Sequence, residues 1–354
     1  MQETIRQDVE AIISSNKSLL QKLEGESVLV TGGAGFLGAY FVDVLAAWND
    51  QHATKPCEIH CMDTFITGAP KRLRHLEGDP HFHKLKRSVA EPLPQGLGVS
   101  YIVHFASIAS PAFYRKYPVE TIDSNVAGTR NLLEYASARK AKSMLFLSTS
   151  EIYGDPPADR IPTGEIYRGN VSCTGPRACY DESKRLGETL CVNFFRERGA
   201  RVKIARPFNV YGPGLRLDDK RVIPDMFLGA MMSREITMFS DGTPTRSFCY
   251  VSDAISAFLQ ILLSDYDGEP FNVGNDSEEI SMGALAGEIA SLFEGSVRIT
   301  YAMSAERDYL TDNPQRRCPD LSKIRRLLGY QPKVGLKEGL SRLKKWYEDE
   351  QGVA

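Results

Sequence analysis

A glycine-rich turn between an apolar run and a helical pattern constrains this chain more than any other feature. The turn spans residues 31–38 (TGGAGFLG) and directly follows the apolar run Val28-Leu29-Val30. Glycines at 32, 35 and 38 allow a tight turn and a close approach of the backbone to a ligand. Such a turn after a strand, and at the start of a helix, predicts a pyrophosphate held at the helix N-terminus.

An acidic residue at the end of the next predicted strand adds to this prediction. Asp63 follows the apolar residues of segment 58–62. A carboxylate at this position accepts hydrogen bonds from an adenosine ribose and repels a 2′-phosphate. The turn and Asp63 together therefore predict NAD, rather than NADP, as the cofactor.

Strand-like and helix-like segments alternate as far as Arg206. We expect strands over 27–30, 58–62, 101–105, 144–148 and 202–205, and helices over 36–48, 119–139 and 180–198. This rhythm is typical of an α/β fold with a doubly wound parallel Rossmann sheet. Beyond Arg206 the rhythm loosens into a smaller C-terminal lobe. Its helices are expected over 223–232, 252–263, 281–293, 321–328 and 336–348.

The domain boundaries follow from this pattern. An amphipathic helix is expected over 1–25 as a packing helix or dimer arm, followed by the NAD-binding domain over 26–206. Residues 207–247 and 275–354 form the smaller lobe, and 248–274 is expected to return to the main sheet. Residues 49–58 are expected to form an enlarged surface loop.

Composition narrows the range of partners and compartments. The 354 residues are 42% hydrophobic, enough for a large core, and the net charge of −2 offers no basic field for nucleic acid or a membrane surface. The seven cysteines contain no Cys-x-x-Cys pair, so we expect free thiols in a cytoplasmic protein and no bound metal. We find no apolar signal core and no stretch as apolar as a membrane span.

A tyrosine and a lysine stand four residues apart in segment 180–184 (YDESK), so they share one face of a predicted helix. An ammonium beside a phenol is expected to lower the pKa of the tyrosine. Tyr180 can then act as a general base on a substrate hydroxyl while a nicotinamide takes the hydride. The hydroxyls of Ser148, Thr149 and Ser150 follow a predicted strand, and they either orient the same substrate oxygen or serve turn chemistry.

From Glu26 to about Trp346 the chain resembles the extended short-chain dehydrogenase/reductase family of nucleotide-sugar enzymes. The resemblance rests on the Gly-x-x-Gly-x-x-Gly turn, the Tyr-x-x-x-Lys motif, residues 104–107 (HFAS) and residues 206–209 (RPFN). It implies a Rossmann NAD-binding domain, a C-terminal lobe that binds a nucleotide sugar, and oxidation of the sugar at its C4 hydroxyl.

The resemblance also implies roles for individual residues. The expected catalytic residues are Tyr180, Lys184, Thr149, Ser150, Glu151 and Arg246. The expected NAD-binding residues are Gly32, Gly35, Phe36, Leu37, Gly38, Asp63, Thr67, Gly68, Ala106, Ser107, Asn125, Ser148, Tyr180, Lys184 and Pro207. The expected substrate-binding residues are Ser110, Tyr114, Arg177, Asn209, Arg221 and Arg246. Arg246 holds either the sugar carboxylate or the diphosphate.

Three stretches are most similar to the UDP-glucuronate decarboxylase (UDP-xylose synthase) subfamily. They are residues 149–156 (TSEIYGDP), 175–182 (GPRACYDE) and 313–320 (NPQRRCPD). Similar 4-epimerases have a small residue in place of Glu151, and 4,6-dehydratases have an Asp where this chain has Ser150. The resemblance thus favours C4 oxidation, loss of the C6 carboxylate and re-reduction. A UDP-glucuronate or UDP-glucose 4-epimerase, a 4,6-dehydratase and a non-catalytic NAD-binding sensor remain the alternatives.

The helices predicted over 119–139 and 180–198 carry apolar stripes. The stripe residues are Leu132, Leu133, Leu186, Leu190 and Phe194. In the family that the chain resembles, such helices pair across a two-fold axis, which implies a homodimer. The alternative is that the stripes cover the sheet.

Overall fold

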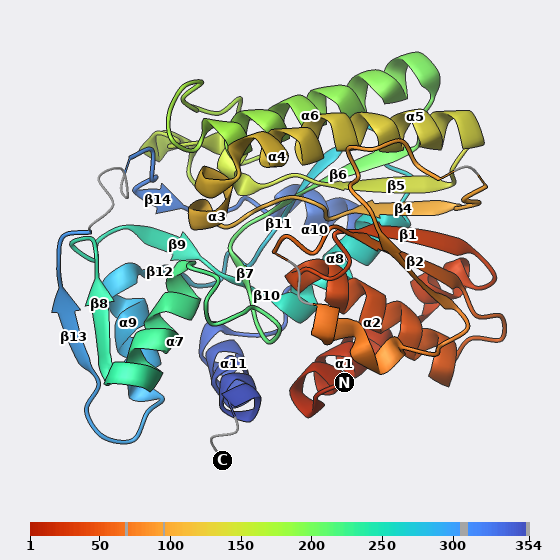
Figure 1. Ribbon diagram of the computed structural model, residues 1–354. Helices are drawn as coiled ribbons and strands as arrows, with labels where there is room; N and C mark the ends of the chain where they lie inside the picture. The colour runs from red at the N-terminus through yellow and green to blue at the C-terminus, as the bar shows by residue number, and fades with distance from the viewer. Residues whose placement is uncertain (68–69, 95, 305–310, 352–354) are drawn as a thin grey trace.

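The computed structural model describes residues 1–67, 70–94, 96–304 and 311–351. Its centre is a seven-stranded parallel sheet in the order β11-β6-β5-β4-β1-β2-β3 (Figure 1). The strands are β1 (Ser27–Thr31), β2 (Glu58–Asp63), β3 (Phe82–Lys86), β4 (Tyr101–His104), β5 (Ser143–Leu147), β6 (Val202–Pro207) and β11 (Pro270–Val273). The strand order reverses between β1 and β4, and ligands bind parallel sheets at such a point, beside the carboxyl ends of the strands.

Helices cover both faces of the sheet, as Figure 1 shows. One face carries α4 (Pro118–Asp123), a π-helical turn (Ser124–Gly128), α5 (Thr129–Arg139) and α6 (Ala178–Arg198). The other carries α1 (Glu3–Leu20), α2 (Phe36–Gln51) and α8 (Val251–Leu262). The doubly wound α/β sheet predicted from the alternation is therefore present.

The N-terminal helix α1 is part of the core of this domain. Ile5, Val9 and Ile12 are buried among residues of the neighbouring helices α2 and α8. The fully buried carboxylate of Asp8 accepts hydrogen bonds from Tyr40 at 3.0 Å and from Tyr250 and Arg342 at 2.9 Å each. The helix thus joins α2, the end of β10 (Cys249–Tyr250) and the C-terminal helix α11 (Leu336–Gln351).

The C-terminal lobe combines short strands with helices. Its helices are α7 (Val222–Ser233), α9 (Met282–Ser291), α10 (Ser322–Leu328) and α11. Its strands include the pair β8 (Glu235–Met238) and β13 (Arg298–Tyr301), and the three-stranded sheet of β12 (Glu279–Ser281), β9 (Thr245–Ser247) and β14 (Arg316–Arg317). Strand β7 (Val210–Tyr211) pairs with β10, and the short helix α3 (Pro111–Lys116) follows β4. Across the described ranges, no helix is long and apolar enough to cross a membrane.

Several expectations need correction. Helix α2 extends to Gln51, so the loop predicted over 49–58 is shorter than expected. The helix predicted over 119–139 contains the π-helical turn. Leu132, Leu133 and Phe194 are buried against the sheet, whereas Leu186 is 46% exposed. Most of the predicted stripe therefore covers the sheet. The domain boundaries proposed above stay a prediction, although β11, from segment 248–274, does pair with β6.

Candidate active site

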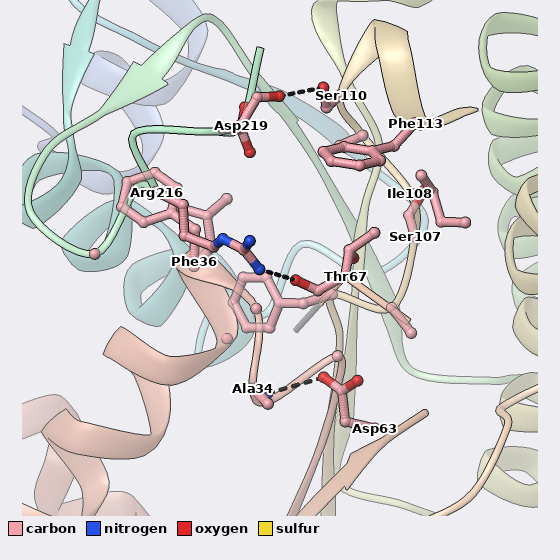
Figure 2. A pocket seen from close by; sticks show the side chains of 18 of the residues that line it. Ala34, Phe36, Asp63, Thr67, Ser107, Ile108, Ser110, Phe113, Arg216 and Asp219 are labelled. Atoms are coloured by element: carbon pink, nitrogen blue, oxygen red, sulfur yellow. Dashed lines mark hydrogen bonds between the residues drawn. The ribbon is translucent and has the colours of Figure 1, made fainter. Parts of the chain in front are cut away.

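A cavity of about 1610 Å³ lies at the carboxyl ends of the strands. Its walls come from the glycine turn, the ends of β2, β4 and β5, helix α6 and the C-terminal lobe. Two hydrogen bonds join opposite walls, as Figure 2 shows. The Arg216 guanidinium donates to the Thr67 carbonyl at 3.4 Å, and the Ser110 hydroxyl donates to the Asp219 carbonyl at 2.6 Å.

The glycine turn packs so closely against neighbouring backbone that two of its positions have no space for a side chain. Gly32 has φ +67°, and a Cβ there would lie 2.6 Å from the Ala106 nitrogen. A Cβ on Gly38 would lie 2.2 Å from the Gly32 carbonyl oxygen. Only glycine therefore fits these two positions, and helix α2 begins directly after Gly35. A cradle of this shape at a helix N-terminus fits the pyrophosphate of a dinucleotide.

Asp63 closes the turn at the end of β2. Its Oδ2 accepts from the Ala34 N–H at 2.9 Å (Figure 2). Its Oδ1 accepts from the Phe65 N–H at 2.7 Å. Burial raises the pKa of this carboxyl, and the backbone donors oppose that effect. Because Asp63 also lines the cavity, its free lone pairs can accept from ribose hydroxyls.

Tyr180 and Lys184 lie on one face of α6, with the Lys184 Nζ 5.9 Å from the centroid of the tyrosine ring. The predicted lowering of the tyrosine pKa is wrong for this arrangement. Burial raises the pKa of Tyr180, and the charges of Glu151 and Asp181 add to that effect. Lys184 instead donates to the Leu147 carbonyl at 2.6 Å, and burial lowers its pKa to about 7.

The hydroxyls after β5 have different partners. Thr149 is the N-cap of a 3₁₀ turn over Ser150–Tyr153 and accepts from the Glu151 N–H at 3.2 Å. A hydrogen bond from Thr149 also favours the ionised form of Tyr180, which lowers its pKa and opposes the effect of burial. Ser148 donates to Glu188 at 2.5 Å. Of the two roles predicted as alternatives, Thr149 thus has the turn role, and orientation of a substrate oxygen stays a prediction.

Sequence reasoning missed a buried ion pair beneath Ser148. Arg206 donates to Glu188 through Nε at 2.8 Å and through Nη2 at 2.5 Å. Glu188 lies four residues after Lys184 on the same face of α6. That spacing indicates that Glu188 shares a helix face with Lys184. No local pattern in the sequence indicates that Arg206 on β6 would pair with Glu188.

Glu151 is held by two arginines. Arg317 on β14 donates to both carboxylate oxygens, with Nη2 at 2.8 Å from Oε2, and Arg177 donates to Oε2. These charges hold the pKa of Glu151 well below its usual range although burial would raise it. Arg177 also lies 3.7 Å from Asp181, whose pKa burial raises to about 8. Arg317 lies in a stretch that the sequence singled out, without a role assigned to it.

The cavity brings most of the predicted site residues together. Those that line it are Gly32, Gly35, Phe36, Leu37, Gly38, Asp63, Thr67, Ala106, Ser107, Ser110, Ser148, Thr149, Ser150, Glu151, Tyr180, Lys184, Pro207, Asn209 and Arg221. Arg221 also pairs with Asp219 at 2.5 Å. Asn209 has φ +38° and donates to the Ser247 carbonyl at 2.9 Å.

Four predicted residues lie behind the cavity wall formed by the described residues. The Tyr114 ring stacks on Tyr180 with centroids 5.2 Å apart, and Asn125 donates to Ser183 at 2.9 Å. Arg177 contacts Glu151, as described above. Arg246 is bound to the carbonyls of Thr245 and Pro314 at 2.8 and 2.6 Å, and burial together with the charge of Arg317 lowers its pKa to about 9. Gly68 lies outside the described residues.

Comparison with known proteins gives consistent matches. A model of the NAD dependent epimerase/dehydratase family matches residues 28–274. UDP-glucuronic acid decarboxylase 6 of Arabidopsis thaliana is 40% identical over 92% of this chain and 90% of its own. UDP-glucuronic acid decarboxylase 1 of Xenopus tropicalis is 37% identical over a match that covers 94% of this chain and 74% of its own.

Solved structures match at the level of the fold. DesIV, a dTDP-glucose 4,6-dehydratase from Streptomyces venezuelae solved with NAD and TYD bound, has a TM-score of 0.80 at 25% identity and covers 92% of this chain and 98% of its own. A UDP-glucose 4-epimerase from Thermotoga maritima has a TM-score of 0.79 at 24% identity and covers 92% and 99%.

Proposed function

Because this chain belongs to the NAD dependent epimerase/dehydratase family, we propose that it is a UDP-glucuronate decarboxylase that uses NAD without net redox change. The observation that carries the proposal is the placement of Glu151 beside Thr149 and Tyr180 in one cavity. Relatives with the decarboxylase name, about 40% identical over nine tenths of both chains, support it.

The residues present fit NAD. The glycine turn would hold the pyrophosphate, and Asp63 would accept from the adenosine ribose. NAD, when bound, would supply a positively charged ring that accepts a hydride from C4 and returns it later, and this charge would favour the phenolate of Tyr180. Tyr180 then takes the proton of the C4 hydroxyl, and Thr149 orients that oxygen.

A carbonyl at C4 is β to the C6 carboxylate of a glucuronate. The C5–C6 bond can then break with loss of CO₂, and its electron pair spreads over C5 and the C4 oxygen. Hydroxyls of Tyr180 and Thr149 would donate to that oxygen as its charge develops. A proton from solvent then completes C5. When the hydride returns to C4, Tyr180 gives its proton back to the C4 oxygen, so the net change is a carboxylate and a proton converted into CO₂ and a C5 hydrogen.

The state of Glu151 argues against dehydration. Loss of a C6 hydroxyl as water needs a proton donor, but Ser150 is a poor acid and Glu151 is held ionised by Arg177 and Arg317. Loss of CO₂ from a carboxylate needs no donor at C6. The site therefore favours decarboxylation over 4,6-dehydration.

We also propose a homodimer formed through α4 and α6. These adjacent helices expose Val119 (63%), Ile122 (40%) and Leu186 (46%) on the outside of the molecule. Exposed apolar side chains gathered on neighbouring helices are typical of an interaction surface. The seven cysteines are free, and this supports a reducing compartment such as the cytoplasm.

The test is mass spectrometry of the purified protein incubated with UDP-glucuronate and NAD. We expect a product lighter than the substrate by CO₂, and Tyr180→Phe should retain NAD but form no product. An unchanged mass together with a new isomer in the NMR spectrum would contradict the proposal and indicate a 4-epimerase.

A further inference from the structure

We propose that Glu188 is a positioning residue for the cofactor. It accepts the hydroxyl proton of Ser148 in a hydrogen bond and leaves the Ser148 oxygen as a fixed acceptor for the nicotinamide half of NAD. The inference rests on the proposed function only in its use of NAD. Ser148 lines the cavity that the described residues form, and Glu188 does not. The glutamate would therefore affect the cofactor through the serine.

The direction of the hydrogen bond between the two side chains follows from charge. The Glu188 carboxylate accepts from the Arg206 guanidinium through Nε at 2.8 Å and through Nη2 at 2.5 Å. A carboxylate only accepts hydrogen bonds, so the contact of 2.5 Å with Ser148 runs from the serine hydroxyl to Glu188. The Ser148 oxygen then keeps lone pairs for a ligand but has no proton to donate to it.

Buried contacts on both sides hold this arrangement in place. The remaining terminal nitrogen of Arg206 donates to the Tyr153 hydroxyl and to the Glu165 carbonyl at 2.9 Å each. The Ser148 backbone N–H donates to the Ala205 carbonyl at 2.8 Å, one residue before Arg206. Neighbouring strands thus fix the backbone of Ser148, and the ion pair fixes its hydroxyl.

The place of Ser148 in the cavity selects the nicotinamide half of the cofactor. The glycine turn and Asp63 account for the pyrophosphate and the adenosine ribose. Lys184 donates to the carbonyl of Leu147, the residue before Ser148, and Tyr180 lines the same cavity. The ring that exchanges a hydride must reach this end. The nicotinamide half carries N–H donors on its carboxamide and O–H donors on its ribose, and both suit a fixed acceptor.

The role of Glu188 is to fix the serine hydroxyl before the cofactor binds. A serine hydroxyl without a partner rotates, and its proton can point at the donor that it should accept from. With Glu188 in place, that rotation is already restricted, so less conformational freedom is lost on binding. Removal of either side chain should therefore weaken binding of the cofactor.

The experiment is a calorimetric titration of the full chain with NAD, without substrate, that compares Ser148→Ala with Ser143→Ala. Ser143 is the matched control because it begins the same strand, is buried, and donates to the Leu262 carbonyl at 2.6 Å. It is not among the described residues that line the cavity. A second titration uses 3-acetylpyridine adenine dinucleotide, in which a methyl group replaces the carboxamide NH₂. The melting temperature of each variant is measured alongside.

We expect Ser148→Ala to weaken NAD binding by about 3- to 10-fold, as the loss of one hydrogen bond does, and Ser143→Ala to change it by less than about twofold. The analogue identifies the donor. If the donor is the carboxamide, the analogue should bind Ser148→Ala and the wild type equally. If the donor is a ribose hydroxyl, the analogue should lose the same factor as NAD while the melting temperature stays unchanged.

The contribution of Glu188 is measured with Glu188→Met, which keeps the length of the side chain and removes the acceptor. It should weaken NAD binding about as much as Ser148→Ala does, and by no more than about twofold further in a Ser148→Ala background. Its melting temperature should fall in both backgrounds, because the buried Arg206 loses its partner. Glu197→Gln, at a side chain 75% exposed on the same helix, is the control and should change neither quantity.

Two results would overturn the inference. One is an NAD affinity of Ser148→Ala equal to that of Ser143→Ala, which decides the matter even if Glu188→Met does not fold. The other is an equal loss of affinity from Glu188→Met in both backgrounds, which would indicate a purely structural carboxylate. No step of this test uses UDP-glucuronate, so a failure of the proposed decarboxylation would be seen separately.

Discussion

Lys184 is buried, and the only hydrogen-bond acceptor of its amine in the described structure is the Leu147 carbonyl. Burial lowers the pKa of its ammonium group from 10.5 to about 7. The unfolded chain therefore binds more protons than the folded one between these two values. Burial of the charged amine therefore destabilises the folded state fully below about pH 7, and this destabilisation disappears as the pH rises.

This sign gives a prediction about stability. Relative to Lys184→Met, the wild-type protein should gain free energy of unfolding as the pH rises from 7 to 9, by about 1.4 kcal/mol per pH unit. Chemical denaturation of both proteins at several pH values measures the difference, in which other titrating groups cancel. A difference that stays constant with pH would contradict the account of Lys184.

A substitution at Gly32 tests whether the glycine turn holds the pyrophosphate of NAD. Gly32→Ala places a Cβ 2.6 Å from the Ala106 nitrogen at φ +67°, so the turn must open. We expect NAD affinity to fall by about tenfold or more, which corresponds to about 1.4 kcal/mol. Calorimetric titration with NAD measures this. Gly287→Ala on α9, where a Cβ meets no atom within 4 Å, is the control, and equal affinity in both variants would refute the cradle.

At the scale of elements, the pattern of the sequence predicts the buried strands best. β1, β4 and β5 are runs of apolar residues beside turn residues, so burial on both faces is visible in the sequence itself. Strand β3 (FHKLK) lies at the sheet edge and has two apolar residues among three basic ones, so the apolar signal there is weak. Strands of two or three residues, such as β14 and β9, exist only because distant segments pair.

The candidate site likewise contains features that the local sequence predicts and features that depend on distant segments. The glycine turn, Asp63 and the Tyr180–Lys184 pair follow from local spacing. The ion pairs of Glu151 with Arg317 and of Glu188 with Arg206 do not, because each arginine lies on a different element from its carboxylate. The effect of burial on the pKa of Tyr180 also depends on packing that spacing alone does not describe.

Helix α1 provides a prediction about an element. Asp8→Ala removes the acceptor of Tyr40, Tyr250 and Arg342 and leaves these groups without it in the core. Loss of one partner from a buried charged network costs about 3–5 kcal/mol of unfolding free energy. Denaturation curves measure the loss. Glu10→Gln, on an exposed ion pair of the same helix, should change stability by less than about 0.5 kcal/mol, and an equal effect would contradict the role of Asp8.

At the scale of the whole molecule, the exposed apolar residues of α4 and α6 predict the assembly. Leu186→Glu places a charge in the proposed dimer interface, so the variant should be a monomer at concentrations where the wild type is a dimer. Light scattering after size-exclusion chromatography measures both masses. Met232→Glu, 67% exposed on α7 of the C-terminal lobe, should leave the dimer intact. A monomeric wild type would contradict the proposal.

Both lobes contribute residues to the candidate active site. The main sheet supplies the glycine turn, Thr149 and Glu151. The C-terminal lobe supplies Arg317, Arg221 and Arg216, and the Arg216 guanidinium donates to the Thr67 carbonyl on the other side of the cavity. We propose that this arrangement oxidises C4, releases CO₂ from C6 and restores the C4 hydrogen within one cycle.

The most direct measurement uses UDP-glucuronate carrying deuterium at C4 and ¹³C at C6, with NAD, analysed by mass spectrometry and NMR. The account predicts ¹³CO₂ release and a product pentose that keeps its deuterium at C4, because the hydride that leaves is the one that returns. A product that keeps its ¹³C carboxylate would contradict the account, and so would a product that exchanges its deuterium.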